Sequence, residues 1–159
     1  MAIPDLQITG AVARITLRRP DQANRLEPDD LAALTDHIAQ VNASPDVLVL
    51  QLLAEGKYFC SGYDISRIGG ARTVAFDTVV NAIEDARPVT LAVLQGSAYG
   101  GATDIALACD FRLGCEGIDM FMPAARLGLH FYQERLSQLI LNLFEKKLLH
   151  HLWLSFQYL

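Results

Sequence analysis

The sequence lacks the features that would place it in a membrane, on nucleic acid or in a secretory pathway. It has no run of about 18 or more apolar residues, so no segment is predicted to span a membrane. Its N-terminal stretch, MAIPDLQITGAVARITL, has neither the basic start nor the small-residue cleavage site of a signal peptide. Basic residues number 13 against 18 acidic ones, and the net charge of −5 argues against a nucleic-acid partner.

Cysteine is also scarce, with an odd total of 3 and no spacing typical of metal ligands. Cys60 precedes a turn-like Ser61-Gly62, and Cys109 lies in an apolar run, so both are interpreted as small buried or half-buried thiols. Cys115 does not complete a metal-ligand spacing with the other two cysteines. These features favour a reducing compartment, and we expect a cytoplasmic protein.

What the sequence does contain is apolar side chains in alternating strand and helix patterns. The 159 residues are 52% hydrophobic and 19% charged, which predicts a globular chain with a real core. Strand and helix segments alternate, so we expect an α/β fold with helices packed on a mostly parallel sheet. The expected strands are 5–9, 11–17, 47–53, 89–96, 110–115 and 119–123, and the expected helices are 31–41, opened by 28–30, then 73–85, 102–108 and a helical period from 136. Strands 47–53 and 89–96 are continuous apolar runs of the kind buried on both faces.

Two glycine-containing loops, FCSGYD and GSAYGGATD, each follow one of these apolar strands. Ligand sites in open α/β sheets lie beyond the carboxyl ends of strands. Glycine permits positive φ, and a helix start leaves N–H groups without intrahelical partners. One amide from each loop would therefore make an oxyanion hole for a carbonyl oxygen that gains negative charge. A dinucleotide site is the competing interpretation, but GSAYGGA lacks the G-x-G-x-x-G spacing.

Asp104 is the one carboxylate in the second loop and helix start, three residues after Gly101. At about one helical turn from the amide of Gly101, it is placed to exchange a proton beside a polarised carbonyl. The same position equally suits a carboxylate that only complements the helix dipole or pairs with a buried arginine. The pattern itself leaves both interpretations open.

At these residues the chain resembles the crotonase family, the enoyl-CoA hydratase/isomerase superfamily. Four segments carry the resemblance in order: ITLRRPDQANRL, GKYFCSGYDI, VLQGSAYGGATDIALACDFRL and FMPAARLGL. The resemblance implies a crotonase-like core of ββα repeats and a CoA thioester substrate. It implies no cofactor beyond the coenzyme A of the substrate, and a homo-oligomer, trimer or hexamer.

Carried over by motif, the resemblance assigns the two oxyanion amides to Tyr63 and Gly101, and the acid/base or orienting role to Asp104. The alternatives for the two amides are a plain strand-to-loop turn and a helix start. Substrate contacts are expected from the neighbouring loop residues Lys57, Ser61, Gly62, Tyr99 and Gly100. Lys57 equally suits a solvated loop lysine, and packing is the favoured role of Tyr99.

One departure from the family concerns the catalytic acids. Family hydratases use two glutamates, and here the matching positions hold Asp104 and Ala124. Alanine transfers no proton, so isomerisation, decarboxylation or thioester hydrolysis is favoured over standard hydration. Glu134 is interpreted as a surface charge at a helix start, and His130 has no partner in the sequence. The alternative is a catalytically inactive relative that binds acyl-CoA or oligomerises.

The second departure is the C-terminal part, where the chain stops while family members continue. We expect a crotonase-like core over 1–135 and an apolar helical tail over 136–159. An apolar tail of this kind on a shortened domain would leave an exposed apolar patch, so we predict self-association through Leu136–Leu159.

Overall fold

A computed structural model of the chain describes residues 2–63 and 74–122, which all belong to the unit Met1–Pro123. Strands β1 (Asp5–Thr9) and β2 (Val12–Leu17) form an antiparallel hairpin, as expected. Strands β3 (Val49–Ala54), β4 (Val89–Leu94) and β6 (Phe111–Gly114) then add in parallel, in the order β1-β2-β3-β4-β6. The sheet is therefore mixed and mostly parallel, as the sequence predicts.

Two short strands were not anticipated as a pair. β5 (Ala98–Tyr99) and β7 (Met120–Phe121) form a separate two-stranded parallel sheet beside the main one. The strand expected at 119–123 corresponds to β7. β5 was missed because a two-residue strand flanked by serine and glycine has no periodicity to detect.

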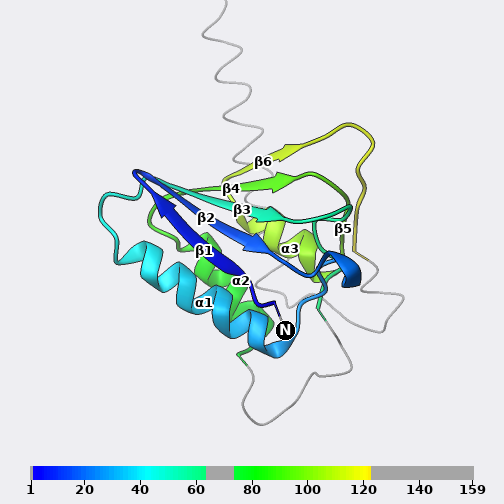
Figure 1. Cartoon of the computed structure of the whole chain (residues 1–159), viewed down its shortest axis with the longest axis horizontal. Helices are drawn as coiled ribbons and strands as arrows, with labels where there is room; N and C mark the ends of the chain where they lie inside the picture. The colour runs from blue at the N-terminus through cyan, green and yellow to red at the C-terminus, as the bar shows by residue number, and fades with distance from the viewer. Residues whose placement is uncertain (1, 64–73, 123–159) are drawn as a thin grey trace, which may run out of the picture. The chain divides into compact units, whose positions relative to one another are not determined.

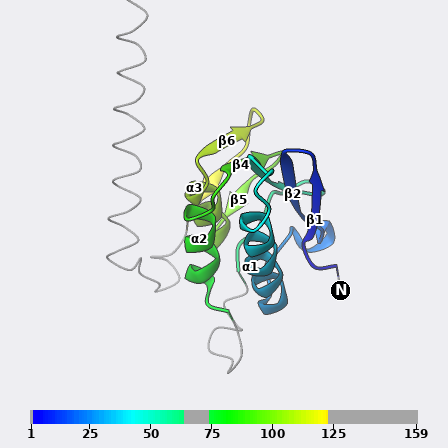
Figure 2. The same cartoon turned by 90° about the vertical axis from the view of Figure 1, so that its left-hand side faces the viewer.

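Three helices, α1 (Pro28–Asn42), α2 (Phe76–Glu84) and α3 (Gly101–Ala108), lie on one side of the main sheet (Figure 1 and Figure 2). Proline in the first turn of α1 and a reciprocal capping box between Glu27 and Asp30 define where that helix starts. Its expected apolar face is confirmed as buried: Leu31, Leu34, Ile38 and Val41. A short 3-10 turn, η1 (Pro20–Gln22), precedes it.

Alternation along the strands shows which face of the sheet the helices cover. In β2 the buried residues are Ala13, Ile15 and Leu17, and in β3 they are Leu50 and Leu52. The residues between them are only half buried. The prediction that 47–53 and 89–96 are buried on both faces is therefore wrong, because the helices described here pack against one face only.

Other sequence predictions differ at their boundaries or lie outside the described residues. The helix expected from Thr73 begins at Phe76, and Val74 and Ala75 before it are not helical. The predicted domain boundary after 135, the helical tail and its association all fall outside the described residues. Within the described part of the chain, no helix has the length and apolar character needed to cross a membrane.

Candidate functional site

Two loops meet at one edge of the sheet because they follow neighbouring parallel strands. Residues 55–63 leave β3 and residues 95–100 leave β4, whose carboxyl ends lie side by side. Their backbones pair directly: the Phe59 N–H donates to Ser97 O at 3.1 Å, and the Tyr99 N–H donates to Cys60 O at 3.0 Å. The predicted convergence of the two glycine-containing loops is therefore present in the structure.

Gly62 lies against the start of α3. Its φ is +96°, and a Cβ added there would lie 2.8 Å from Tyr99 O and 3.2 Å from Gly101 N. A side chain cannot occupy that space without moving backbone, so glycine is needed both for its conformation and for its size. The contact brings the peptide that follows Gly62 close to the first peptide of α3.

The direction of both candidate oxyanion amides follows from planar trans peptides. The Gly62 carbonyl accepts the Leu26 N–H at 2.8 Å, so the Tyr63 N–H on the same peptide points away from Leu26. Likewise the Gly100 carbonyl accepts the Thr103 N–H at 2.9 Å, so the Gly101 N–H points out of the helix start. Within 2–63 and 74–122, no backbone hydrogen bond between loops or turns uses the N–H group of Tyr63 or of Gly101.

Phe76, the first residue of α2, contacts both sides of this arrangement. A Cβ at Gly101 would lie 2.6 Å from Cζ of the Phe76 ring, so the ring rests on the glycine backbone. The ring centroids of Tyr63 and Phe76 are 6.0 Å apart and tilted by 41°. Phe76 is not predicted from the sequence, because its place in an amphipathic helix carries no signal of contact with distant loops.

Asp104 lies in the first turn of α3 and is half buried, while Thr103 and Ile105 beside it are buried. The helix begins at Gly101, so the carboxylate is on the first turn after the candidate oxyanion amide, as expected. This placement suits both interpretations made from the sequence, proton exchange and complementarity with the helix dipole.

The turn before α1 holds the first loop in place through Asn24, a residue to which the sequence assigns no role. The Asn24 Nδ2 group donates to Glu55 O at 2.8 Å and to Tyr58 O at 2.9 Å, and Oδ1 accepts the Arg19 N–H at 2.8 Å. Asn24 is 2% exposed with φ of 50°, a left-handed conformation that asparagine tolerates better than most residues. The sequence shows only an asparagine in a polar turn, and its burial emerges from the structure.

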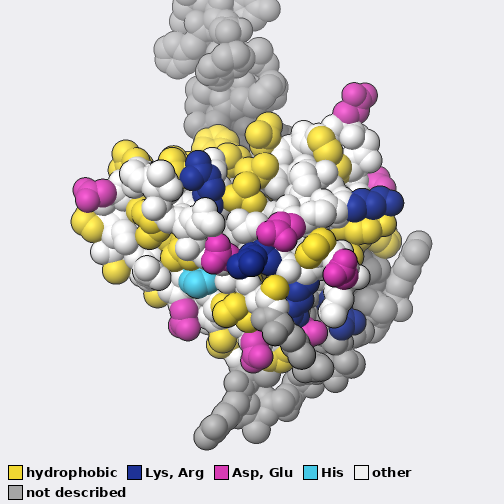
Figure 3. Space-filling view, in the orientation of Figure 1, with side chains coloured by type: hydrophobic (Ala, Val, Ile, Leu, Met, Phe, Trp, Pro, Cys, Tyr) yellow, Lys and Arg dark blue, Asp and Glu magenta, His cyan; other side chains and the backbone are white. Residues whose placement is uncertain are grey.

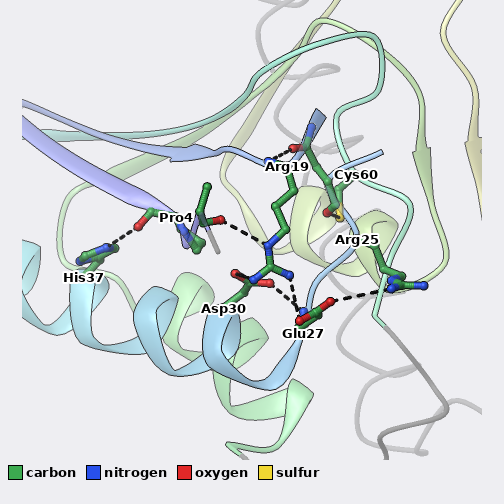
Figure 4. A network of polar contacts seen from close by, with 9 residues as sticks. Pro4, Arg19, Arg25, Glu27, Asp30, His37 and Cys60 are labelled. Carbon is green, nitrogen blue, oxygen red and sulfur yellow. Dashed lines mark hydrogen bonds and ion pairs between the residues drawn. The ribbon is translucent and has the colours of Figure 1, made fainter. Parts of the chain in front are cut away.

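A buried ionic cluster supports the same turn (Figure 4). Arg19 pairs with Glu27 at 3.2 Å and with Asp30 at 3.0 Å, and all three side chains are nearly excluded from solvent. Burial raises the pKa of Asp30 above its ordinary 3.8, even though the Glu27 N–H and Arg19 both act to lower it. The cluster joins the capping box of α1 to the segment that contacts the first loop.

The remaining expected substrate contacts lie on or beside the two loops. Lys57 is exposed, and its Nζ lies 5.3 Å from the centre of the Tyr58 ring, which is 6.3 Å from the Tyr99 ring. Ser61 is half buried and donates its N–H to Ala23 O at 2.9 Å, and Gly100 has φ of +56°. Ala124, His130 and Glu134 lie outside the described residues. In 2–63 and 74–122, no three His, Cys, Asp or Glu side chains are grouped to hold a metal ion.

Curated proteins with established names are similar to this chain in sequence. The (E)-benzylidenesuccinyl-CoA hydratase of Thauera aromatica is 34% identical over 118 residues, covering 68% of this chain and 45% of that protein. A peroxisomal Δ(3,5)-Δ(2,4)-dienoyl-CoA isomerase of Arabidopsis thaliana is 26% identical over 121 residues, covering 64% of this chain and 44% of that protein. The chain thus spans about half the length of the curated relatives it matches.

Solved structures show the same fold. An enoyl-CoA hydratase from Mycobacterium avium subsp. paratuberculosis matches with a TM-score of 0.74 at 29% identity, over 81% of this chain and 53% of that one. DspI of Pseudomonas aeruginosa matches with a TM-score of 0.73 at 28% identity, over 82% and 52%. The family model described as enoyl-CoA hydratase/isomerase matches residues 7–139. On its sequence and its fold alike, the chain belongs to the enoyl-CoA hydratase/isomerase family.

Proposed function

We propose that this chain acts on acyl-CoA thioesters and stabilises an enolate with the backbone N–H groups of Tyr63 and Gly101. The observation that carries the proposal is the close packing of the two loops at Gly62. A Cβ built on Gly62 would lie 3.2 Å from the backbone nitrogen of Gly101. Both amides lie on peptides whose carbonyls are hydrogen bonded on the opposite side. Donors preorganised in this way stabilise oxygen charge without rearranging during the reaction.

The chemistry follows from where the charge develops. When the carbon next to the thioester carbonyl loses a proton, the electron pair moves to the oxygen, and the two N–H groups bind the resulting oxyanion. Asp104 accepts that proton as a carboxylate and returns it from the resulting carboxylic acid. The first turn of α3 supplies both the Gly101 amide and the Asp104 carboxylate, so one element positions donor and base.

Within the family we favour isomerisation, decarboxylation or thioester hydrolysis over standard hydration. Ala124 stands at the position of the second glutamate of the hydratases, and the two-acid addition of water needs both groups. Enolate formation and return of the proton need one base. One curated relative is named a hydratase and another an isomerase, which supports the view that the reaction varies within the family.

The test replaces Asp104 by asparagine and measures turnover of a panel of acyl-CoAs. A general base contributes about 100- to 10,000-fold, so kcat of Asp104→Asn is expected to fall by that factor. Asp77→Asn is the matched control, since Asp77 also lies in the first turn of a helix and is exposed. Equal turnover in wild type and Asp104→Asn would remove the assigned role of Asp104.

The alternative is a catalytically inactive relative that binds acyl-CoA, and the alanine at position 124 favours it. Isothermal titration with a non-hydrolysable acyl-CoA, combined with the turnover panel, separates the two. Binding by wild type without turnover of any acyl-CoA would establish the binding protein. Failure to bind would leave an oligomerising relative of the family.

A further inference from the structure

We propose that Cys60 is a positioning residue, whose thiol aligns the Tyr63 amide for the thioester by joining Asn24 O to the Gly62 N–H. The inference rests on the proposed function and extends it to a residue that touches no substrate. Cys60 Sγ donates to Asn24 O at 3.0 Å and accepts the Gly62 N–H at 3.3 Å. One side chain thus connects the turn before α1 with the peptide that precedes the candidate oxyanion amide.

Three backbone hydrogen bonds also join residues 60–62 to neighbouring segments. The Cys60 carbonyl accepts the Tyr99 N–H, the Ser61 N–H donates to Ala23 O, and the Leu26 N–H donates to Gly62 O. Of the peptide N–H groups in 60–62, that of Gly62 is the one held by a side chain. Gly62 has φ of +96° and, as a glycine, a flexible backbone. The hydrogen bond from its N–H to the Cys60 sulfur therefore restrains rotation of the backbone at Gly62.

Burial keeps the thiol able to play this role. Cys60 is 0% exposed, and desolvation raises its pKa to about 12, so the sulfur stays protonated and donates at neutral pH. A thiolate in its place would have no proton to give to Asn24 O. The hydrogen-bond geometry and the protonation state therefore agree.

The test compares three variants of the full chain, Cys60→Ala, Cys60→Ser and Cys109→Ala. Alanine removes the hydrogen bonds of the sulfur and leaves the Gly62 N–H without its partner, whereas serine keeps a donor and acceptors. Cys109→Ala is the matched control, because Cys109 is also buried but lies at the C-terminal end of α3. Thermal unfolding of all three measures the general cost of removing a buried thiol.

The first readout is amide hydrogen exchange, which needs no ligand. Exchange at Gly62 and Leu26 is expected to speed up at least tenfold in Cys60→Ala, and to stay within about threefold of wild type in Cys60→Ser and Cys109→Ala. Unchanged exchange at both amides in Cys60→Ala would overturn the positioning role, whatever the ligands do.

The second readout isolates the carbonyl contact by comparing acetyl-CoA with S-ethyl-CoA, the thioether that lacks the carbonyl oxygen. Two ordinary hydrogen bonds correspond to a preference of roughly tenfold for acetyl-CoA in wild type. In Cys60→Ala the preference is expected to fall below about threefold with S-ethyl-CoA affinity unchanged, and in Cys60→Ser to remain. A full preference in Cys60→Ala would overturn the proposal, as would an equal loss of affinity for both probes.

The two readouts separate this inference from the proposed function. If wild type binds neither probe but Gly62 loses protection in Cys60→Ala, the acyl-CoA function is wrong and with it the purpose assigned to Cys60. If wild type shows the carbonyl preference and Cys60→Ala retains it, the proposed function stands and the positioning role is wrong.

Discussion

Gly62 is a residue at which the two loops pack closely, and its substitution tests separately the cost of the backbone conformation and the cost of the close contact. Three of the five described glycines with positive φ show the contrast: Gly10 and Gly117 have nothing within 4 Å of an added Cβ, while Gly62 has backbone at 2.8 Å. The cost at Gly10 and Gly117 is therefore one of backbone conformation alone. Gly62 adds a collision with the Tyr99 carbonyl.

Gly62→Ala is expected to lower the free energy of unfolding by about 2–4 kcal/mol, and Gly117→Ala by about 1 kcal/mol. The difference reports the backbone collision at Gly62, because both substitutions impose a left-handed conformation on alanine. Urea denaturation of the two variants measures it. Equal losses would show that the loops separate freely, contrary to the close contact described here.

Cys60 gives a second prediction at this scale, from the pH dependence of stability. Burial raises its pKa from 9.0 to about 12, so above pH 9 the folded chain binds a proton that the unfolded chain releases. The contribution of the protonated thiol to the free energy of unfolding is fully present below pH 9 and is lost as the pH rises toward 12. Between pH 9 and pH 10 the free energy of unfolding falls by about 1 kcal/mol for this reason. The wild-type loss should therefore exceed that of Cys60→Ser by this amount in denaturation at both pH values. Parallel losses would contradict a buried, protonated thiol.

At the scale of elements, the close approach of α2 and α3 depends on what Gly101 lacks. A Cβ there would lie 2.6 Å from Cζ of Phe76 and 3.0 Å from Cε2. Gly101 is the first residue of α3, and Phe76 is the first of α2, so the two helix starts touch through a ring and a bare backbone. The same ring lies beside Tyr63, which connects this helix contact to the candidate oxyanion hole.

The contact predicts strong coupling between positions 76 and 101. Gly101→Ala alone should destabilise by about 1–3 kcal/mol through overpacking. In a Phe76→Ala background the same substitution should cost less than about 0.5 kcal/mol or stabilise, because alanine favours a helix over glycine. A double-mutant cycle by chemical denaturation measures the coupling. Additive effects would place the ring away from Gly101.

At the scale of the whole molecule, one surface stays apolar. Phe111 and Leu113 of β6 are 61% and 62% exposed, and they pair with half-buried Leu91 and Val93 of β4. Hydrophobic side chains gather over this part of the sheet (Figure 3). The helices cover the opposite face, where Arg112 donates to the carbonyls of Ala106 in α3 and of Cys109, which follows that helix. The open face thus belongs to the side without described helices.

Self-association through 136–159 stays a prediction, since those residues lie outside the described part of the chain. Replacing Leu139 and Leu143 together by serine should lower the weight-average mass at high concentration if the apolar tail carries the contact. Leu48→Ser is the control, because Leu48 is an exposed leucine, at 61%, within the described unit. Sedimentation equilibrium measures the masses, and a wild-type monomer at high concentration would contradict the prediction.

Most of the fold could be predicted because its signals are local. The spacing of Leu31, Leu34 and Ile38 marked the buried face of α1, and apolar runs located β3 and β4. The errors came from partners that are distant in sequence. β5 exists because Ala98 and Tyr99 pair with β7, and β3 is buried on one face only because helices pack on one side.

The sequence by itself determined the family, the order of strands and helices, and the identity of the residues in the two loops, because these depend on local periodicity and short motifs. It also determined that Asp104 follows Gly101 by one helical turn. Only the tertiary structure decided that Gly62 rests against Gly101, that Phe76 touches both loops, and that Asn24 and Cys60 hold the first loop in place. These contacts join residues that are 13 to 39 positions apart. Such pairs are brought together by the packing of the sheet and helices, not by any rule that acts along the chain.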